Sequence, residues 1–91
     1  MYVIISYDVN SNKCNRIMKL LRKYLFHVQK SVFEGELTQK EINIIKEEVN
    51  KIVDENDSVI IYQITSYKAL KKEQIKEKLN NNLIIWFDYY K

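Results

Sequence analysis

The 91-residue sequence has no proline, a single glycine and a single cysteine, Cys14. One cysteine excludes a disulfide within the chain and is typical of a reducing compartment, so we expect a cytoplasmic protein. No apolar run approaches the roughly 20 residues of a membrane-spanning helix. The chain enters a strand-like run at once, so we expect neither a membrane segment nor a signal peptide.

Charge is unevenly distributed along the chain. The formal net charge is +3, yet the stretch from Val9 to Phe33 has no acidic residue and six basic ones, whereas the rest has more acidic than basic residues. The six are Lys13, Arg16, Lys19, Arg22, Lys23 and Lys30. Such segregation predicts a polyanionic partner, most commonly nucleic acid. A solvated basic helix face is the alternative interpretation.

The first ten residues are those around which we expect the chain to be organised. Residues 2–7 are β-branched and aromatic with hardly a break, which predicts a central strand. This strand ends at Asp8, before the polar run 10–12. A carboxylate at the end of a central strand is well placed to bind a cation. The alternative interpretation is that Asp8 ends the strand and accepts hydrogen bonds within the following turn.

Residues 10–12 provide the N-cap of a helix over about 12–26. Its apolar stripe includes Cys14, which we interpret as a core residue, and the opposite side has a basic ridge. The ridge consists of Arg16, Lys19 and Lys23. Residues 27–37 are extended in character and predict two short strands or one bulged strand.

Thr38 and Glu41 form a capping box that begins a second helix ending near Val53. Residues 58–64 predict a strong strand. Residues 67–80 read as a lysine-rich helix with Leu70, Ile75 and Leu79 inward, and residues 83–87 predict a final strand.

This order predicts an α+β fold, a ferredoxin-like βαββαβ sandwich with an extra C-terminal helix and strand. We expect a single domain over 1–91, with a core over 1–64 and an extension over 65–91 that contributes to a dimer. Two helices cover one sheet face, and the open face would be buried in a homodimer. The residues expected on that open face are Val3, Ile5, Tyr7, Val59, Ile61 and Tyr62. The strand over 83–87 would add to the partner's sheet edge.

Several of these segments resemble the Cas-two family, the small CRISPR-associated protein of the spacer-acquisition pair. The resemblance rests on Tyr7-Asp8-Val9, on Arg16, on the block 28–34 (VQKSVFE) and on Asp57-Ser58-Val59 followed by Ile61-Tyr62. It covers about residues 1–64, with the spacing of that family. Two departures are Phe26-His27 near the position of a family glycine, and the lack of a second acid soon after Asp8.

The resemblance implies a homodimer in which the two Asp8 side chains face each other across the two-fold axis. Asp8 would be both a catalytic residue and the ligand of Mg²⁺ or Mn²⁺ in an endonuclease. Ser31 and Phe33 would lie in the active region, although Phe33 is also a candidate for the core. The implied partners are the CRISPR-associated integrase, with residues 81–91 as the expected contact, and double-stranded DNA or single-stranded RNA. No membrane partner is expected.

Two other functions stay open. A toxin-type endoribonuclease of similar fold is the nearest enzymatic alternative. A non-catalytic ferredoxin-like regulatory module that binds a small ligand is the second, and the lack of a glycine-rich loop speaks against it. His27 is the only histidine, which is too few for a histidine-based nuclease, so we interpret it as a packing or surface residue.

Overall fold

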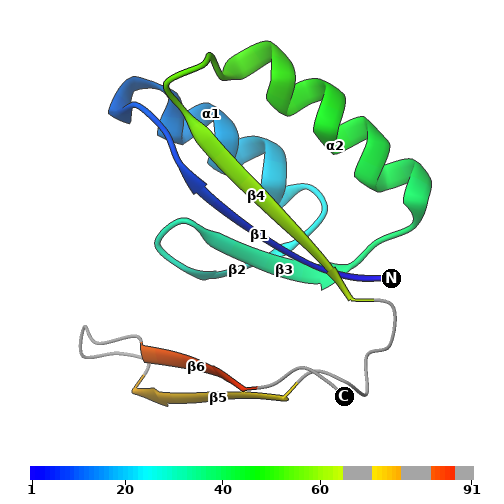
Figure 1. Ribbon diagram of the computed structural model, residues 1–91, viewed down its shortest axis with the longest axis vertical. Helices are drawn as coiled ribbons and strands as arrows, with labels where there is room; N and C mark the ends of the chain where they lie inside the picture. Colours follow the sequence, from blue (N-terminus) through cyan, green and yellow to red (C-terminus); the bar gives the residue numbers. More distant parts are fainter. Residues whose placement is uncertain (65–70, 77–82, 88–91) are drawn as a thin grey trace.

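The computed structural model describes residues 1–64, 71–76 and 83–87. These described residues form eight elements in the order β-α-β-β-α-β-β-β (Figure 1). The elements are β1 (Tyr2–Asp8), α1 (Ser11–Arg22), β2 (Phe26–Gln29), β3 (Val32–Glu36), α2 (Gln39–Ile52), β4 (Ser58–Ile64), β5 (Lys71–Lys76) and β6 (Leu83–Phe87). The first six have the βαββαβ order, which confirms the ferredoxin-like prediction.

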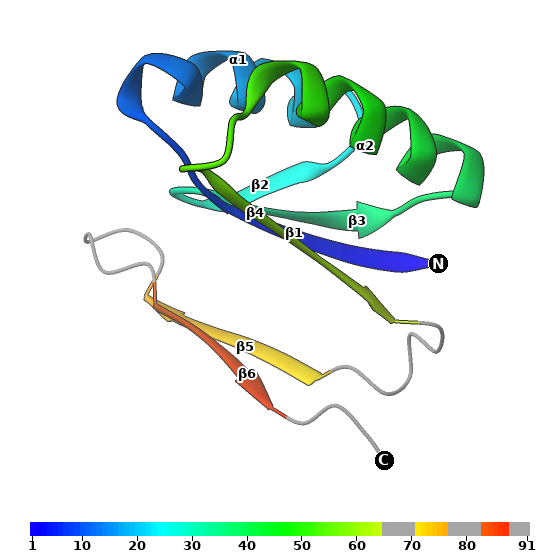
Figure 2. The same cartoon turned by 45° about the horizontal axis from the view of Figure 1, so that its top comes forward.

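The first four strands form one antiparallel sheet in the order β2-β3-β1-β4. Strand β1 is therefore central, as its apolar sequence predicts. Helices α1 and α2 lie together on one face, whereas β5 and β6 form a separate hairpin on the other side (Figure 2). Neither described helix is long and apolar enough to cross a membrane.

Both helices begin at the caps that the sequence predicts. The side chain of Asn10 accepts a hydrogen bond from the Asn12 N–H, at 3.2 Å. Thr38 and Glu41 form the complete capping box, in which each side chain bonds the other residue's N–H. Helix α1 ends at Arg22 rather than near residue 26, because Phe26 already pairs with β3.

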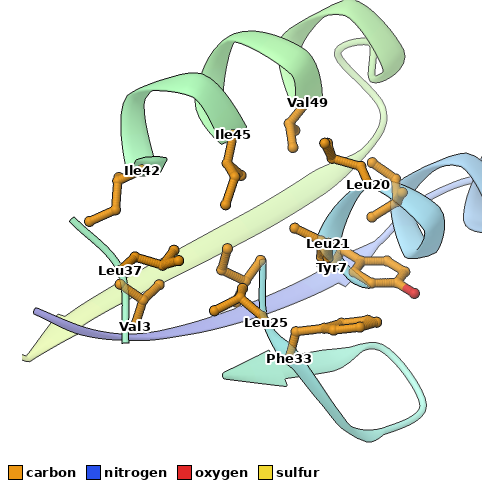
Figure 3. Packing of buried hydrophobic residues seen from close by; sticks show 12 residues of the cluster. Val3, Tyr7, Leu20, Leu21, Leu25, Phe33, Leu37, Ile42, Ile45 and Val49 are labelled. Carbon is orange, nitrogen blue, oxygen red and sulfur yellow. The ribbon is translucent and has the colours of Figure 1, made fainter. Parts of the chain in front are cut away.

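The core lies between the helices and the sheet (Figure 3). Side chains of β1, β3, α1 and α2 meet there, and Phe33 is fully buried among them. Five residues expected on the open face instead lie on the helix side. Val3, Ile5 and Tyr7 belong to the core, and Val59 and Ile61 pack against it. That expectation was wrong because a nearly continuous apolar run has no alternation to distinguish its two faces.

The open face contains the alternate residues of each strand. The register aligns Glu34, Ile4 and Tyr62 across β3, β1 and β4, so these side chains share one face. Tyr62 therefore lies on the open face, as predicted. Tyr62 is 51% exposed and Ile60 is 47% exposed, whereas Ile4 and Glu34 are buried.

The segment over 27–37 forms two strands joined by a tight turn. The chain reverses at Lys30 and Ser31, where Lys30 has a positive φ of 33°. The register between β2 and β3 also shifts between His27 and Gln29, which marks an irregularity. The structure thus combines the two alternatives that the sequence left open. Leu25, which precedes β2, approaches closely at Gly35, where a Cβ would lie 3.0 Å from a Leu25 methyl carbon.

The prediction of a helix over 67–80 is wrong for the part that the structure describes, residues 71–76. Residues Lys71–Lys76 form β5, which pairs antiparallel with β6. The lysine-rich sequence favours a helix only weakly, and the pairing with the strongly β-prone run Leu83–Phe87 outweighs that preference. Ile75 is in β5, while Leu70 and Leu79 lie outside the described residues. The strand predicted over 83–87 is confirmed.

Candidate functional site

Asp8 is the last residue of β1 and its side chain is exposed. It lies opposite Ser58, the first residue of β4. The neighbouring Tyr7 N–H donates to the Ser31 carbonyl oxygen at 3.1 Å. One end of the sheet therefore brings together Asp8, the β2–β3 turn and, three residues further along the chain, the start of α1 (Figure 1).

Phe33 supports this end of the sheet through packing. Its ring stacks against His27 with centroids 4.5 Å apart, and against Tyr7 with centroids 6.3 Å apart. Burial also raises the pKa of the Tyr7 hydroxyl. His27 Nε2 lies 2.6 Å from the Lys30 carbonyl oxygen, so the ring holds the turn that presents Ser31. Because Phe33 is fully buried, its role is that of a core residue and it does not offer a face to a nucleic-acid base.

Most of the predicted basic residues are available to a ligand. Four of them are exposed on α1 and its C-cap, and none of the four forms an ion pair with the described residues. These are Arg16, Lys19, Arg22 and Lys23. Lys30 is exposed at the β2–β3 turn. We call these five residues the basic surface.

Lys13 differs from the basic surface. Its Nζ lies 2.8 Å from Asp54 Oδ2 and 2.5 Å from Asp57 Oδ2. The hydrogen bonds with Asp54 and with Asp57 raise the pKa of Lys13. Its positive charge is therefore largely balanced within the chain.

Asp57 is the residue at this site that sequence reasoning missed. It precedes β4, and its side chain is only 3% exposed. Its carboxylate accepts hydrogen bonds from the Asn10 N–H at 3.0 Å, from the Asp54 N–H at 2.9 Å and from Lys13 Nζ. The bond from Lys13, followed by the backbone bond from Asp54, lowers the pKa of Asp57 to about 2. Nothing in the local sequence shows that this aspartate contacts residues so distant along the chain.

A divalent metal fits this site only in part. No group of three His, Cys, Asp or Glu side chains gathers anywhere in the described ranges. One chain contributes the Asp8 carboxylate, whereas Mg²⁺ prefers about six oxygen ligands, several of them water. Two Asp8 carboxylates from a symmetric pair, with water and phosphate oxygens, would supply a suitable donor set.

Comparison with known proteins gives the family. The family model described as CRISPR associated protein Cas2 matches residues 1–72. The CRISPR-associated endoribonuclease Cas2 of Methanocaldococcus jannaschii is 58% identical over 74 residues, which cover 80% of this chain and 65% of that protein. The chain thus spans slightly less than two thirds of that relative's length. The protein of the same name from Pyrococcus furiosus is 52% identical over 67 residues, 72% of this chain and 79% of that one.

A solved structure supports the same family assignment. The crystal structure of Streptococcus pyogenes Cas2 at pH 6.5 is 35% identical and superimposes with a TM-score of 0.66. The match covers 70% of this chain and 86% of that one. With the matching family model and the shared fold, these similarities confirm the resemblance, and the chain belongs to the CRISPR-associated Cas2 family.

Proposed function

We propose that this protein is a homodimeric CRISPR adaptation subunit that binds duplex nucleic acid and bridges dimers of the integrase. The observation that supports this most directly is the basic surface. Its residues are exposed and form no ion pair with the described part of the chain. Such a surface suits contacts to phosphates, which position a duplex without reading its sequence.

The basic surface predicts a particular salt dependence. Each phosphate neutralised by a lysine or arginine contributes roughly −0.9 to the slope of log K against log salt concentration. Replacing Arg16, Lys19 and Lys23 by alanine should therefore weaken duplex binding and flatten that slope by up to about 3. Fluorescence anisotropy with a labelled duplex, at several salt concentrations, measures both quantities.

Lys40 and Lys46 provide the matched control, because they are exposed lysines on α2. Replacing them by alanine should leave the slope unchanged. A wild-type affinity for duplex that does not change with salt concentration would contradict the proposed phosphate contacts. Adding the integrase to the same assay tests bridging, which predicts a larger complex that needs both proteins.

The homodimer would bury the open sheet face. Ile60 and Tyr62 are large apolar residues exposed there, and Ile4 lies beside Tyr62 in the register. Strand β4 is an edge strand of the four-stranded sheet, so its outer backbone groups are available to a further strand. Strand β6 of the partner is our candidate for that strand, as part of the extension over 65–91. A two-fold axis through this face would also place the two Asp8 residues near each other.

We further propose a divalent-metal-dependent endonuclease centred on Asp8. The two relatives compared above are named endoribonucleases, and Asp8 is an exposed carboxylate at a strand end. Asp8 and its symmetry mate would be the ligands for Mg²⁺ or Mn²⁺. The bound metal would supply a water of lowered pKa and charge stabilisation for the leaving oxygen. Ser31, half-buried at the adjacent turn, would hydrogen-bond a phosphate oxygen.

The substitution Asp8→Asn tests the nuclease. It keeps the size of the side chain but removes its charge, so cleavage of RNA and DNA in Mg²⁺ or Mn²⁺ should be abolished. Glu55→Gln is the matched control, because Glu55 is an exposed acid in the turn before β4. If Asp8→Asn cleaves as fast as the wild type, Asp8 is not the catalytic residue.

A further inference from the structure

Asp57 joins three parts of the chain at one carboxylate. The three donors come from the connection after β1 (Asn10), from the first turn of α1 (Lys13) and from the turn after α2 (Asp54). An aspartate in a surface turn is ordinarily solvated, yet this side chain is 3% exposed. Its carboxylate is therefore a fixed structural group at the end of the sheet where Asp8 lies.

The connection from Asp8 to Asn10 is held at both of its ends. Asp8 is aligned with Ser58 by the pairing of β1 with β4. Asn10 donates its N–H to Asp57, the residue that precedes Ser58, and it also caps α1. Residues 57 and 58 thus fix the backbone on either side of Val9.

We propose that Asp57 is a positioning residue for Asp8, and that the Asn10 N–H is the group through which it acts. This inference rests on the proposed endonuclease at Asp8. A carboxylate that binds a metal must be held within roughly 0.5 Å of its productive geometry, and supporting hydrogen bonds provide that precision. Loss of such a partner commonly costs about 10–100-fold in activity or metal affinity.

Lys13 completes the arrangement electrostatically. A buried carboxylate is stable only with a paired charge or several hydrogen-bond donors, and Asp57 has both. The lysine also neutralises acidic charge near the end of the sheet, which would otherwise repel an approaching phosphate. Lys13 therefore acts within the structure, whereas the basic surface is free to contact the ligand.

Two matched pairs of variants test this inference. Asp57→Asn removes the charge of the buried carboxylate, and Asp54→Asn removes a charge from the same turn without touching the Asn10 backbone. Asn10→Pro deletes the N–H donor, and its φ of −58° matches the angle that proline requires. Asn10→Ala is the reference for that variant, because it loses the same side chain but keeps the N–H. Circular dichroism establishes that each variant is folded.

Cleavage kinetics give the first measurement. Asp57→Asn should lower kcat about 10–100-fold relative to Asp54→Asn, with KM changed less than about twofold. Asn10→Pro should show a similar loss relative to Asn10→Ala. Duplex binding by the basic surface should be retained in all four variants, because none of them changes a residue of that surface.

Amide hydrogen exchange of the metal-free protein gives the second measurement. The Asn10 N–H should be protected in the wild type and in Asp54→Asn, and should exchange faster in Asp57→Asn. Equal kcat in Asp57→Asn and Asp54→Asn, with protection of Asn10 lost, would overturn the inference. If Asp57→Asn does not fold, equal kcat in Asn10→Pro and Asn10→Ala would overturn it instead.

The outcome at Asp8 separates this inference from the proposed function. Cleavage that requires Asp8 but tolerates Asp57→Asn and Asn10→Pro would overturn the positioning role alone. Cleavage that survives Asp8→Asn, or a wild type without metal-dependent cleavage, would overturn the endonuclease and the positioning role together.

Discussion

Individual residues at the end of the sheet differ in how far the sequence could predict them. Asp8 lies at the end of a β-branched run, so its place at a strand end follows from the local pattern. Asp57 follows a helix in a polar turn, which suggests only a solvated acid. Two of its three hydrogen bonds come from donors 47 and 44 residues away, Asn10 and Lys13, and such contacts have no local signal. Lys13 shows the same limit, because its ion pairs with Asp54 and Asp57 distinguish it from the neighbouring basic residues.

Asp57 should make the folding stability of the chain depend on pH in the acidic range. Its pKa is lowered to about 2 in the folded chain, below the ordinary value of an unfolded aspartate, so the unfolded chain binds the proton more readily. Its contribution to stability is therefore present above about pH 4 and is lost as the pH falls through about 2. Urea unfolding should show Asp57→Asn to be less stable than the wild type near neutral pH.

The wild type and Asp57→Asn should differ less in their free energy of unfolding as the pH falls from about 4 towards 2. Other acids titrate in the same range, but they are common to both proteins. A difference that stays constant over this range would mean that the folded chain does not favour ionised Asp57.

Whole elements were predicted where the pattern is periodic and capped. Helix α2 has both a capping box and a regular apolar stripe, and it runs over Gln39–Ile52 as expected. The lysine-rich segment at 67–80 has neither a cap nor a strong stripe, and Lys71–Lys76 pairs with Leu83–Phe87 as a strand instead. A partner strand that lies further along the chain determines that outcome, which local propensity does not reveal.

The capping box should stabilise helix α2 measurably. Thr38→Ala should lower the free energy of unfolding by about 1 kcal/mol, because the Glu41 N–H loses its acceptor. Thr38→Ser is the control and should be nearly neutral, since its hydroxyl accepts the same bond. The urea midpoint measures both. Equal loss in the two variants would indicate that the methyl group of Thr38, rather than its oxygen, stabilises the helix start.

At the scale of the molecule, the four-stranded sheet has two faces of different character. Helices α1 and α2 cover one face with a closely packed core (Figures 2 and 3). The other face exposes Ile60 and Tyr62. The ferredoxin-like arrangement follows from the order of the elements. Which residues of β1 occupy each face does not, because shifting the assignment by one residue exchanges the two faces.

The apolar residues of the open face should hold the proposed dimer together. The double substitution Ile60→Lys and Tyr62→Lys should convert the proposed dimer to a monomer, because it places four charges in an apolar interface. Sedimentation velocity at micromolar concentration measures the change. Asn43→Lys on the exposed side of α2 is the control and should not alter the oligomeric state. A wild type that is already monomeric would contradict the proposed dimer.

The separation of the β5–β6 hairpin from the four-stranded sheet gives the molecule two distinguishable optical probes. Trp86 is the only tryptophan of the chain and lies in β6. Helices α1 and α2 supply the helical part of the far-ultraviolet circular dichroism signal. Tryptophan emission during denaturation therefore reports on the hairpin, and ellipticity reports on the helical layer. Coincident transitions would mean that the hairpin and the core unfold as one cooperative unit, and an earlier fluorescence transition would assign the hairpin a stability of its own.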